Sequence, residues 1–189
     1  MSTQVCCRSS HATTVCLAEI EIDGILIRCS MRRIQEMSHT ITSAFSSTLF
    51  TNLYQHSTIT ISVHVLSQDG SLLAASLNAA TLALIDAGIP MRDYIAACTV
   101  ASAANEDGEA DPLLDLNGVE EQELPFLTLA TTAAGGEDKV CVLMMETRIA
   151  MARLEAMVAV GMDGCRQVRG ILDGVVREHG KRLLDSRVG

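Results

Sequence analysis

The 189-residue chain has a formal net charge of −9, and 48% of its residues are hydrophobic. This length and composition indicate one folded domain with a sizeable core, and they exclude a disordered chain. The negative charge argues against a protein that holds a nucleic-acid backbone on a broad basic face, and 3% aromatic residues argue against recognition by base stacking. Because no apolar run reaches the ~18 residues of a membrane helix, we expect no membrane contact, and we expect no secretory signal.

The cysteine pattern bears on cofactors. Seven cysteines, at positions 6, 7, 16, 29, 98, 141 and 165, include no Cys-x-x-Cys pair. This is typical of reduced thiols in an intracellular protein, several of them filling space in the core. The spacing also fails to match a zinc site, so we expect no metal and no cofactor.

The first third of the chain contains one clear element. Residues 1–30 are mixed, although the alternating stretch from Leu17 to Ile27 permits a strand or hairpin. Residues 34–53 carry apolar side chains at one-faced helical spacing and predict an amphipathic helix. These side chains belong to Ile34, Met37, Ile41, Phe45 and Leu49. The other face is rich in Ser and Thr, so packing rather than intrinsic propensity must hold the helix.

The middle of the chain predicts a strand, a turn and a buried helix. Residues Thr58 to Leu66 alternate between apolar and polar side chains, which favours a strand with one apolar face. Ser67 to Gly70 is a turn sequence. Leu72 to Ala87 is nearly free of charge and apolar on several sides, which predicts a buried helix. Gly88 and Pro90 then end that helix.

The second half predicts four strands and a long helix. Strands are expected over residues 93–101 and 113–117, separated by an acidic loop over 102–112 that has no pattern of metal ligands. Residues 126–132 and 139–147 predict a hairpin. Residues 152–184 then predict one long helix.

The long helix carries an apolar stripe and four glycines. The stripe at three- and four-residue steps consists of Leu154, Val158, Gly161, Cys165, Val168, Leu172 and Val175. Each glycine, at positions 161, 164, 170 and 174, costs up to ~1 kcal/mol relative to Ala in a helix. We therefore expect all four to allow close packing, against a sheet.

Several segments resemble one known family. Asn78–Leu84, Asp86–Asp93, Asp115–Asn117 and Glu120–Glu121 are similar to segments of RNase PH-like proteins, in particular to the eukaryotic exosome ring subunits. The resemblance extends roughly from Arg32 to Leu184. It implies an α+β fold of the RNase PH type (ribosomal protein S5 domain 2-like), with a mixed, antiparallel-rich sheet backed by helices and a long C-terminal helix. We expect residues 31–189 to form this domain, incomplete at its N-terminus, and residues 1–30 to form an atypical, poorly ordered segment.

The resemblance also identifies candidate site residues. In active members, a Gly-Thr/Ser-Arg segment after the central turn holds phosphate, and the corresponding residues here are Ser71, Leu72 and Leu73. Leucine offers no donor to an anion. The first of two catalytic aspartates corresponds to Glu121, and the second falls at Leu127 by direct count or at Glu123 after a short deletion. We therefore expect no catalytic residue, the four degenerate positions being Leu72, Leu73, Glu121 and Glu123.

Other polar residues have competing interpretations. The resemblance implies that Arg32 and Arg33, spaced from Glu36 as in the family, line an RNA path, whereas the alternative is two solvated arginines near a helix start. Asp69 and Asp86 are acidic, but we favour structural roles at a turn and a helix end. We find no nucleophile, histidine and acid arrangement and no glycine-rich nucleotide loop.

The function that the resemblance implies is that of a non-catalytic subunit of the RNA exosome ring, which supports 3′-to-5′ RNA processing and degradation. Its implied partners are other RNase PH-like ring subunits, cap proteins and RNA inside the assembled channel, in the nucleus, nucleolus and cytoplasm. One alternative is an active phosphorolytic 3′-exoribonuclease with Glu121 and Glu123 as acids. Two further alternatives are a paralogous ring subunit and a shortened form that does not enter the ring.

Overall fold

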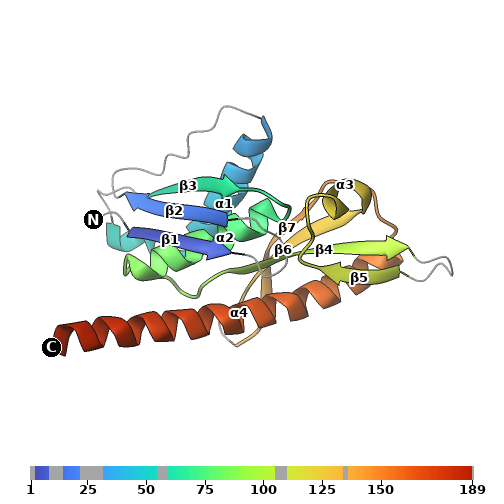
Figure 1. The fold of residues 1–189 in the computed structure, drawn as a ribbon. Helices are drawn as coiled ribbons and strands as arrows, with labels where there is room; N and C mark the ends of the chain where they lie inside the picture. The colour runs from blue at the N-terminus through green and yellow to red at the C-terminus, as the bar shows by residue number, and fades with distance from the viewer. Residues whose placement is uncertain are drawn as a thin grey trace.

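The computed structural model describes residues 3–8, 15–21, 32–54, 59–104, 110–133 and 136–188. This part of the chain contains both strands and helices (Figure 1). In chain order the elements are β1 (Thr3–Arg8), β2 (Val15–Glu21), α1 (Arg32–Thr48), the 3-10 helix η1 (Thr51–Tyr54), β3 (Thr60–Ser67), α2 (Leu72–Asp86), β4 (Ala96–Ala104), β5 (Ala110–Leu114), α3 (Glu120–Glu123), β6 (Phe126–Thr132), β7 (Lys139–Met145) and α4 (Met151–Val188).

The described strands form two sheets. One has the order β1-β2-β3 and the other the order β5-β4-β6-β7, and neighbouring strands in both are antiparallel. The expected α+β class is confirmed, but the single mixed sheet is not, because the described strands pair only in antiparallel fashion. In Figure 1, α2 lies against the three-stranded sheet and α4 runs along the four-stranded one.

Part of the first 30 residues belongs to the three-stranded sheet. β2 covers some of the stretch that was expected to form a strand or hairpin, and it pairs with both β1 and β3. The remaining residues of that stretch, 22–27, lie outside the described part of the chain, as do 1–2, 9–14 and 28–31. The boundary near residue 30 stays a prediction.

The central strand, turn and helix are confirmed. α2 is buried on nearly every side, with Leu77, Ala80 and Leu84 fully inaccessible to solvent. Its small alanines let neighbouring elements approach. The helix ends in a Schellman motif, in which the N–H of Ile89 donates to the Leu84 carbonyl and Gly88 has a φ of 69°.

The helix predicted over residues 34–53 is shorter than expected. α1 ends at Thr48, and η1 follows it. Its apolar face is buried through Ile41, Phe45 and Leu49. Five hydroxyl groups of this helix donate to backbone carbonyl groups three or four residues earlier. They belong to Thr40, Thr42, Ser46, Ser47 and Thr48. Because such bonds do not stabilise a helix, the buried face holds it in place.

The hairpin of β6 and β7 is confirmed, whereas the acidic loop was wrong at both ends. Residues 102–104 continue β4, and residues 110–112 begin β5. Pro112 is tolerated there because β5 is an edge strand of its sheet. The centre of the expected loop, residues 105–109, lies outside the described residues.

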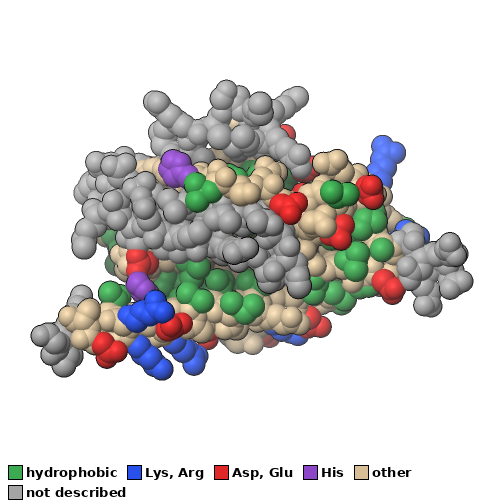
Figure 2. Space-filling view, viewed as in Figure 1, with side chains coloured by type: hydrophobic (Ala, Val, Ile, Leu, Met, Phe, Trp, Pro, Cys, Tyr) green, Lys and Arg blue, Asp and Glu red, His purple; other side chains and the backbone are tan. Residues whose placement is uncertain are grey.

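The long C-terminal helix is confirmed, and it runs for 38 residues, or about 57 Å. Its first half packs on β4, β5 and β6 through Met157 and Cys165, and Leu172 in the second half is buried against Ala96 and Leu82. Its C-terminal end carries exposed side chains of both charges (Figure 2). Among the helices described, neither α4 nor any other combines the length and apolarity needed to cross a bilayer.

Only two of its four glycines pack as expected. A Cβ on Gly161 would lie 3.0 Å from a methyl carbon of Leu129, and one on Gly164 would lie 2.8 Å from Leu114. A Cβ on Gly170 or Gly174 would have no neighbour within 4 Å. The expectation was therefore wrong for the second pair. Leu172, which lies between them, is buried against Ala96 of β4 and Leu82 of α2, so the two glycines lie on the opposite, uncovered side of the helix.

Candidate functional site at the start of the central helix

Two segments far apart in sequence meet at the start of α2. The turn after β3 lies against residues 116–118, which lead into α3. Gly70 has a φ of 85°, and a Cβ there would lie 2.4 Å from the carbonyl oxygen of Leu116. Only glycine allows so close an approach of the two backbones.

Carboxylates occupy the backbone donors of this turn. The N–H of Ser71 donates to Oε1 of Glu121 at 2.6 Å, and the N–H of Gly118 donates to Oδ1 of Asp69 at 3.1 Å. Ser71 has the left-handed φ of 52°, and its hydroxyl donates to the Leu116 carbonyl at 3.1 Å. A negative group near the start of a helix is favourable because it complements the helix dipole.

A reciprocal cap fixes the position of Glu121. Oδ1 of Asn117 accepts the N–H groups of Val119 and Glu120, each at 3.0 Å, while Oε2 of Glu120 accepts the N–H of Asn117 at 2.9 Å. This is a capping box. It orients the single turn of α3, and α3 in turn presents Glu121 to the start of α2.

The two leucines of the expected phosphate segment are part of the core. Leu73 is 6% exposed within the cluster that includes α1, α2 and β3, and Leu72 is partly buried against that cluster. Neither side chain can donate a hydrogen bond. The positions aligned with a phosphate pocket therefore supply apolar packing.

The candidate acids are not brought together. Glu121 reaches Ser71, whereas Glu123 is exposed at the end of α3. Leu127, the alternative position for the second acid, is fully buried in β6. The sequence contained the Asn117-x-x-Glu120 signal of a capping box, which sequence reasoning missed, but no local signal for the contact between Glu121 and Ser71.

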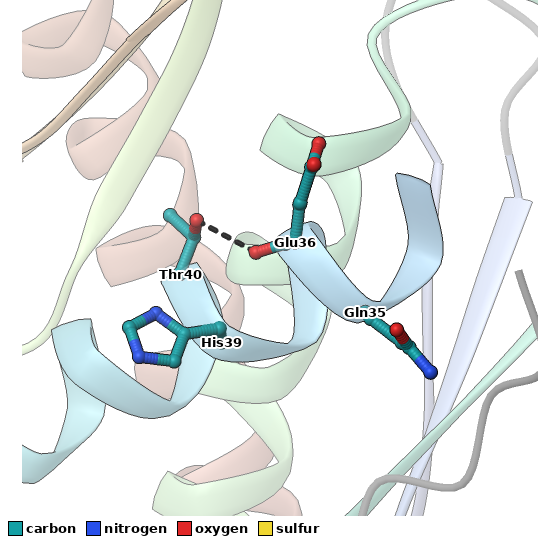
Figure 3. A pocket seen from close by; sticks show the side chains of 4 residues that line it. All are labelled: Gln35, Glu36, His39 and Thr40. Carbon is teal, nitrogen blue, oxygen red and sulfur yellow. Dashed lines mark hydrogen bonds between the residues drawn. The ribbon is translucent and has the colours of Figure 1, made fainter. Parts of the chain in front are cut away.

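The predicted RNA-contacting arginines stand at the beginning of α1. Arg32 and Arg33 are the first residues of that helix, and their side chains lie outside the described part of the structure. The next turns border an open hollow of about 440 Å³ lined by Gln35, Glu36, His39 and Thr40 (Figure 3). The hydroxyl of Thr40 donates to the carbonyl of Glu36 at 2.9 Å. RNA contact by the two arginines stays a prediction.

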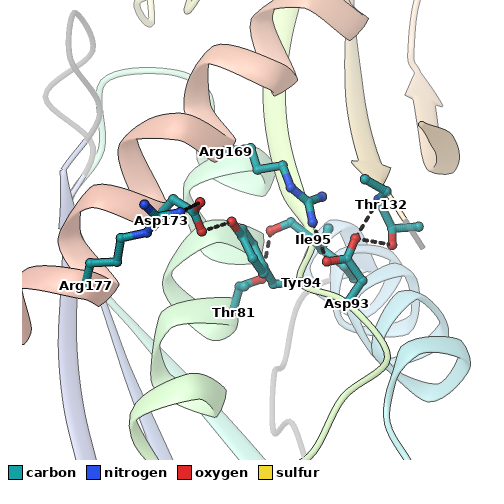
Figure 4. A network of polar contacts seen from close by, with 9 residues as sticks. Thr81, Asp93, Tyr94, Ile95, Thr132, Arg169, Asp173 and Arg177 are labelled. Atoms are coloured by element: carbon teal, nitrogen blue, oxygen red, sulfur yellow. Dashed lines mark hydrogen bonds and ion pairs between the residues drawn. The ribbon is translucent and has the colours of Figure 1, made fainter. Parts of the chain in front are cut away.

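A second polar cluster joins α4 to the segment before β4 (Figure 4). One carboxylate oxygen of Asp93 accepts the N–H of Ala133 at 2.6 Å and the hydroxyl of Thr132 at 3.1 Å, and the other pairs with Arg169. Burial alone would raise the pKa of Asp93, but the bonds from Arg169 and Ala133 and the charge of Arg169 lower the pKa below its usual value.

The same cluster includes a tyrosine. The guanidinium of Arg169 lies 4.3 Å from the ring centroid of Tyr94, whose hydroxyl donates to Asp173. Burial and this hydrogen bond raise the pKa of Tyr94 to about 12. Since every one of these polar groups contacts another within the cluster, the arrangement joins α4 to the sheet.

The remaining acidic candidates also have structural contacts. Asp86, at the end of α2, lies 2.7 Å from Nε2 of His179 on α4. Asp69 accepts the N–H of Gly118, as described above. Among the described residues, no three His, Cys, Asp or Glu side chains are grouped to hold a metal ion.

Comparison with known proteins shows the family. A sequence model of the 3′ exoribonuclease family, domain 1 (RNase PH), matches residues 17–90. The exosome complex component RRP41 homolog of Arabidopsis thaliana is 32% identical over 189 residues, covering 93% of this chain and 72% of that protein. The chain belongs to the RNase PH family.

Two further relatives are similar to this chain over most of its length. The exosome complex component SKI6 of Saccharomyces cerevisiae is 36% identical over 155 residues, covering 82% of this chain. The exosome complex component RRP41 of Homo sapiens is 42% identical over 149 residues, covering 78% of this chain and 58% of that protein. This chain spans 60% of the length of the yeast protein.

A solved structure confirms the RNase PH-like fold. Rice (Oryza sativa) Rrp46 superimposes with a TM-score of 0.75 over 94% of each chain, at 18% sequence identity. At that identity the likeness concerns the fold alone. The family match begins at residue 17, so that β2 lies almost entirely within the matched region.

Proposed function

We propose that this RNase PH family member is a non-catalytic structural subunit of an RNA exosome ring, in which it supports 3′-to-5′ RNA processing and degradation. The names of its relatives SKI6 and RRP41 support membership in an exosome complex. The observation that carries the non-catalytic role is the bond from the Ser71 N–H to the Glu121 carboxylate, beside a leucine packed in the core.

Phosphorolysis needs a site that binds inorganic phosphate. Such a site supplies backbone donors together with a guanidinium or hydroxyl group. Here the Ser71 N–H is already bonded to a carboxylate, and Leu72 and Leu73 supply no donor. A phosphate placed beside Glu121 would also meet a like charge at short range. These features support a scaffold that has kept the fold and lost the anion site.

The proposed partners follow from the proposed ring. They are other RNase PH-like subunits, which together with this chain form a hetero-oligomer, and the cap proteins above them. RNA would pass through the assembled channel, with Arg32 and Arg33 as the proposed contacts at the start of α1. A basic path contributed mainly by partners suits a chain with a net charge of −9. We propose the nucleus, nucleolus and cytoplasm as its locations, and no membrane association.

A phosphate-dependent exonuclease assay tests the catalytic part of the proposal. Rings reconstituted with the wild-type chain, with Glu121→Ala or with Glu123→Ala are incubated with single-stranded RNA and inorganic phosphate. We expect all three rings to release nucleoside diphosphates at the same background rate. A rate that falls by a factor of about 100 or more in the Glu121→Ala ring, the Glu123→Ala ring or both would contradict the proposal, because loss of one preorganised catalytic group costs about that much.

The competing function is that of an active phosphorolytic 3′-exoribonuclease. One observation favours it, namely that an acid at position 121 remains next to the turn after β3. The same assay separates the two functions. Ring assembly is tested independently by co-purification of the 189-residue chain with an RNase PH-like partner, and failure to co-purify would contradict the structural role.

A further inference from the structure

Two cysteines meet inside the core between the four-stranded sheet and α4. The sulfur atoms of Cys98, on β4, and Cys165, on α4, lie 3.4 Å apart, and both are free thiols. Cys98 is 7% exposed and Cys165 is fully buried. The two residues are 67 positions apart in the chain, so the fold brings them together. The proposed function does not use this pair.

Two glycines bring the two thiols together. A Cβ on Gly164 would lie 3.1 Å from the sulfur of Cys98, and the carbonyl oxygen of Gly161 lies 3.2 Å from the same sulfur. Helix and strand can therefore approach closely at this level. Since a disulfide has a sulfur–sulfur distance of about 2.0 Å, bond formation requires the two atoms to approach by only about 1.4 Å.

The contact between the thiols makes them chemically unequal. The contact with Cys98 lowers the pKa of Cys165, and the contact with Cys165 together with burial raises the pKa of Cys98. The thiolate is the reactive form of cysteine. Cys165 is therefore the sulfur that ionises more readily, with Cys98 positioned next to it.

We propose that Cys98 and Cys165 form a redox-sensitive pair, which a small peroxide converts into a disulfide that joins β4 to α4. The Cys165 thiolate attacks hydrogen peroxide, so that an S–O bond forms, the O–O bond breaks, and the hydroxide that leaves takes a proton to become water. Cys98 then loses its proton and attacks this sulfenic acid, an S–S bond forms, and the S–O bond breaks to release a second water. Two thiols are oxidised and one peroxide is reduced.

The burial of the pair limits which oxidants can reach it, and its position between β4 and α4 determines what a disulfide would do. Hydrogen peroxide is small enough to enter a core site that excludes a bulky disulfide oxidant. We therefore expect peroxide to oxidise the pair and oxidised glutathione to be ineffective. The bridge would close a loop from residue 98 to residue 165 and restrict the unfolded chain. It would also prevent α4 from separating from the sheet.

Peptide mapping of the full-length chain tests the proposal. The folded protein is treated with hydrogen peroxide, its remaining thiols are alkylated, and it is digested with trypsin. Cleavage after Arg and Lys places Cys98 in peptide 93–139, Cys141 in 140–148 and Cys165 in 154–166. We expect a cross-link between peptides 93–139 and 154–166, and a rise in Tm of about 5 °C that a reductant reverses.

Single variants make the result specific. Cys98→Ser and Cys165→Ser should each lose the cross-link and the reversible rise in Tm, while Cys141→Ser, a partly buried thiol outside the pair, should keep both. The proposal is overturned if Cys98 and Cys165 stay alkylatable, or oxidise separately to sulfinic acids, at peroxide doses that leave the protein folded. It is equally overturned if the cross-link joins either of them to Cys141 instead.

Discussion

The two halves of α4 both carry glycines and apolar residues, but their glycines have different surroundings. The first half lies on the four-stranded sheet, where Gly161 and Gly164 face side chains of β4, β5 and β6. The second half carries Gly170 and Gly174 with nothing near them, and Ile171 and Val175 are 62% and 49% exposed. Glycine in the first half allows helix and sheet to touch, whereas in the second half it only weakens the helix.

This comparison shows that residue type alone does not reveal the role of a glycine. The apolar stripe runs along both halves, and Leu172 in the second half is still buried against Ala96 and Leu82. Gly170 and Gly174 lie on the other side of the helix, which no described residue covers. The cluster of Asp93, Tyr94, Arg169 and Asp173 lies near the junction and attaches the helix where the tight packing ends. Four measurements test whether the two halves differ in packing.

The largest effect is expected from filling the packed contact. Gly164→Val should lower the free energy of unfolding by about 3 kcal/mol, because the added side chain would overlap Leu114 and the sulfur of Cys98. Gly174→Val is the matched control and should change stability by less than about 0.5 kcal/mol. Urea denaturation checks both. Equal losses in the two variants would show that the halves do not differ in packing.

The next effect is expected at the junction. Arg169→Met keeps much of the aliphatic stem but removes the charge that pairs with Asp93, whose side chain is 13% exposed. We expect a loss of about 2 kcal/mol, because a largely buried carboxylate is left without its partner. Arg182→Met, at a 73% exposed ion pair, should cost less than about 0.5 kcal/mol. A loss of unfolding free energy in Arg169→Met no larger than that in Arg182→Met would show that the pair of Arg169 and Asp93 does not attach α4.

A smaller effect of opposite sign is expected in the exposed half. Gly174→Ala should raise the free energy of unfolding by about 1 kcal/mol, because alanine favours the helix and meets no neighbour. Gly161→Ala should bring no such gain, because its Cβ would lie 3.0 Å from Leu129 and 3.1 Å from Val100. Thermal unfolding of the two variants measures the difference, and the order of the two Tm values decides the outcome.

The smallest effect should be visible only in acid. Because the pKa of Asp93 is lower in the folded protein than the ordinary value of 3.8, its contribution to stability is complete above that pH. The contribution is lost as the pH falls through the lower folded pKa. The difference in unfolding free energy between wild type and Asp93→Asn should therefore be constant near neutral pH and shrink below about pH 4. A difference in unfolding free energy that grows in acid would mean that folding raises the pKa of Asp93 instead of lowering it.

Local patterns in the sequence predicted most of the elements. Apolar spacing and the Gly88 stop predicted α2 within about one residue of its observed bounds, and the same reasoning located α4 and the hairpin of β6 and β7. The resemblance to RNase PH-like proteins supplied the fold class. These features depend on neighbours a few residues apart, which is the range over which periodicity and capping act.

Contacts across long stretches of chain were decided by tertiary structure. Neither the bond from Ser71 to Glu121, 50 residues apart, nor the meeting of Cys98 with Cys165 has a signal in the local sequence. The division of the strands into two sheets, and the side of α4 that is left uncovered at Gly170 and Gly174, likewise depend on how whole elements pack. Sequence patterns were sufficient to predict most of the helices and strands, because those patterns are local. Only the packing of these segments determined which side chains share a site, because such contacts depend on the relative placement of whole elements.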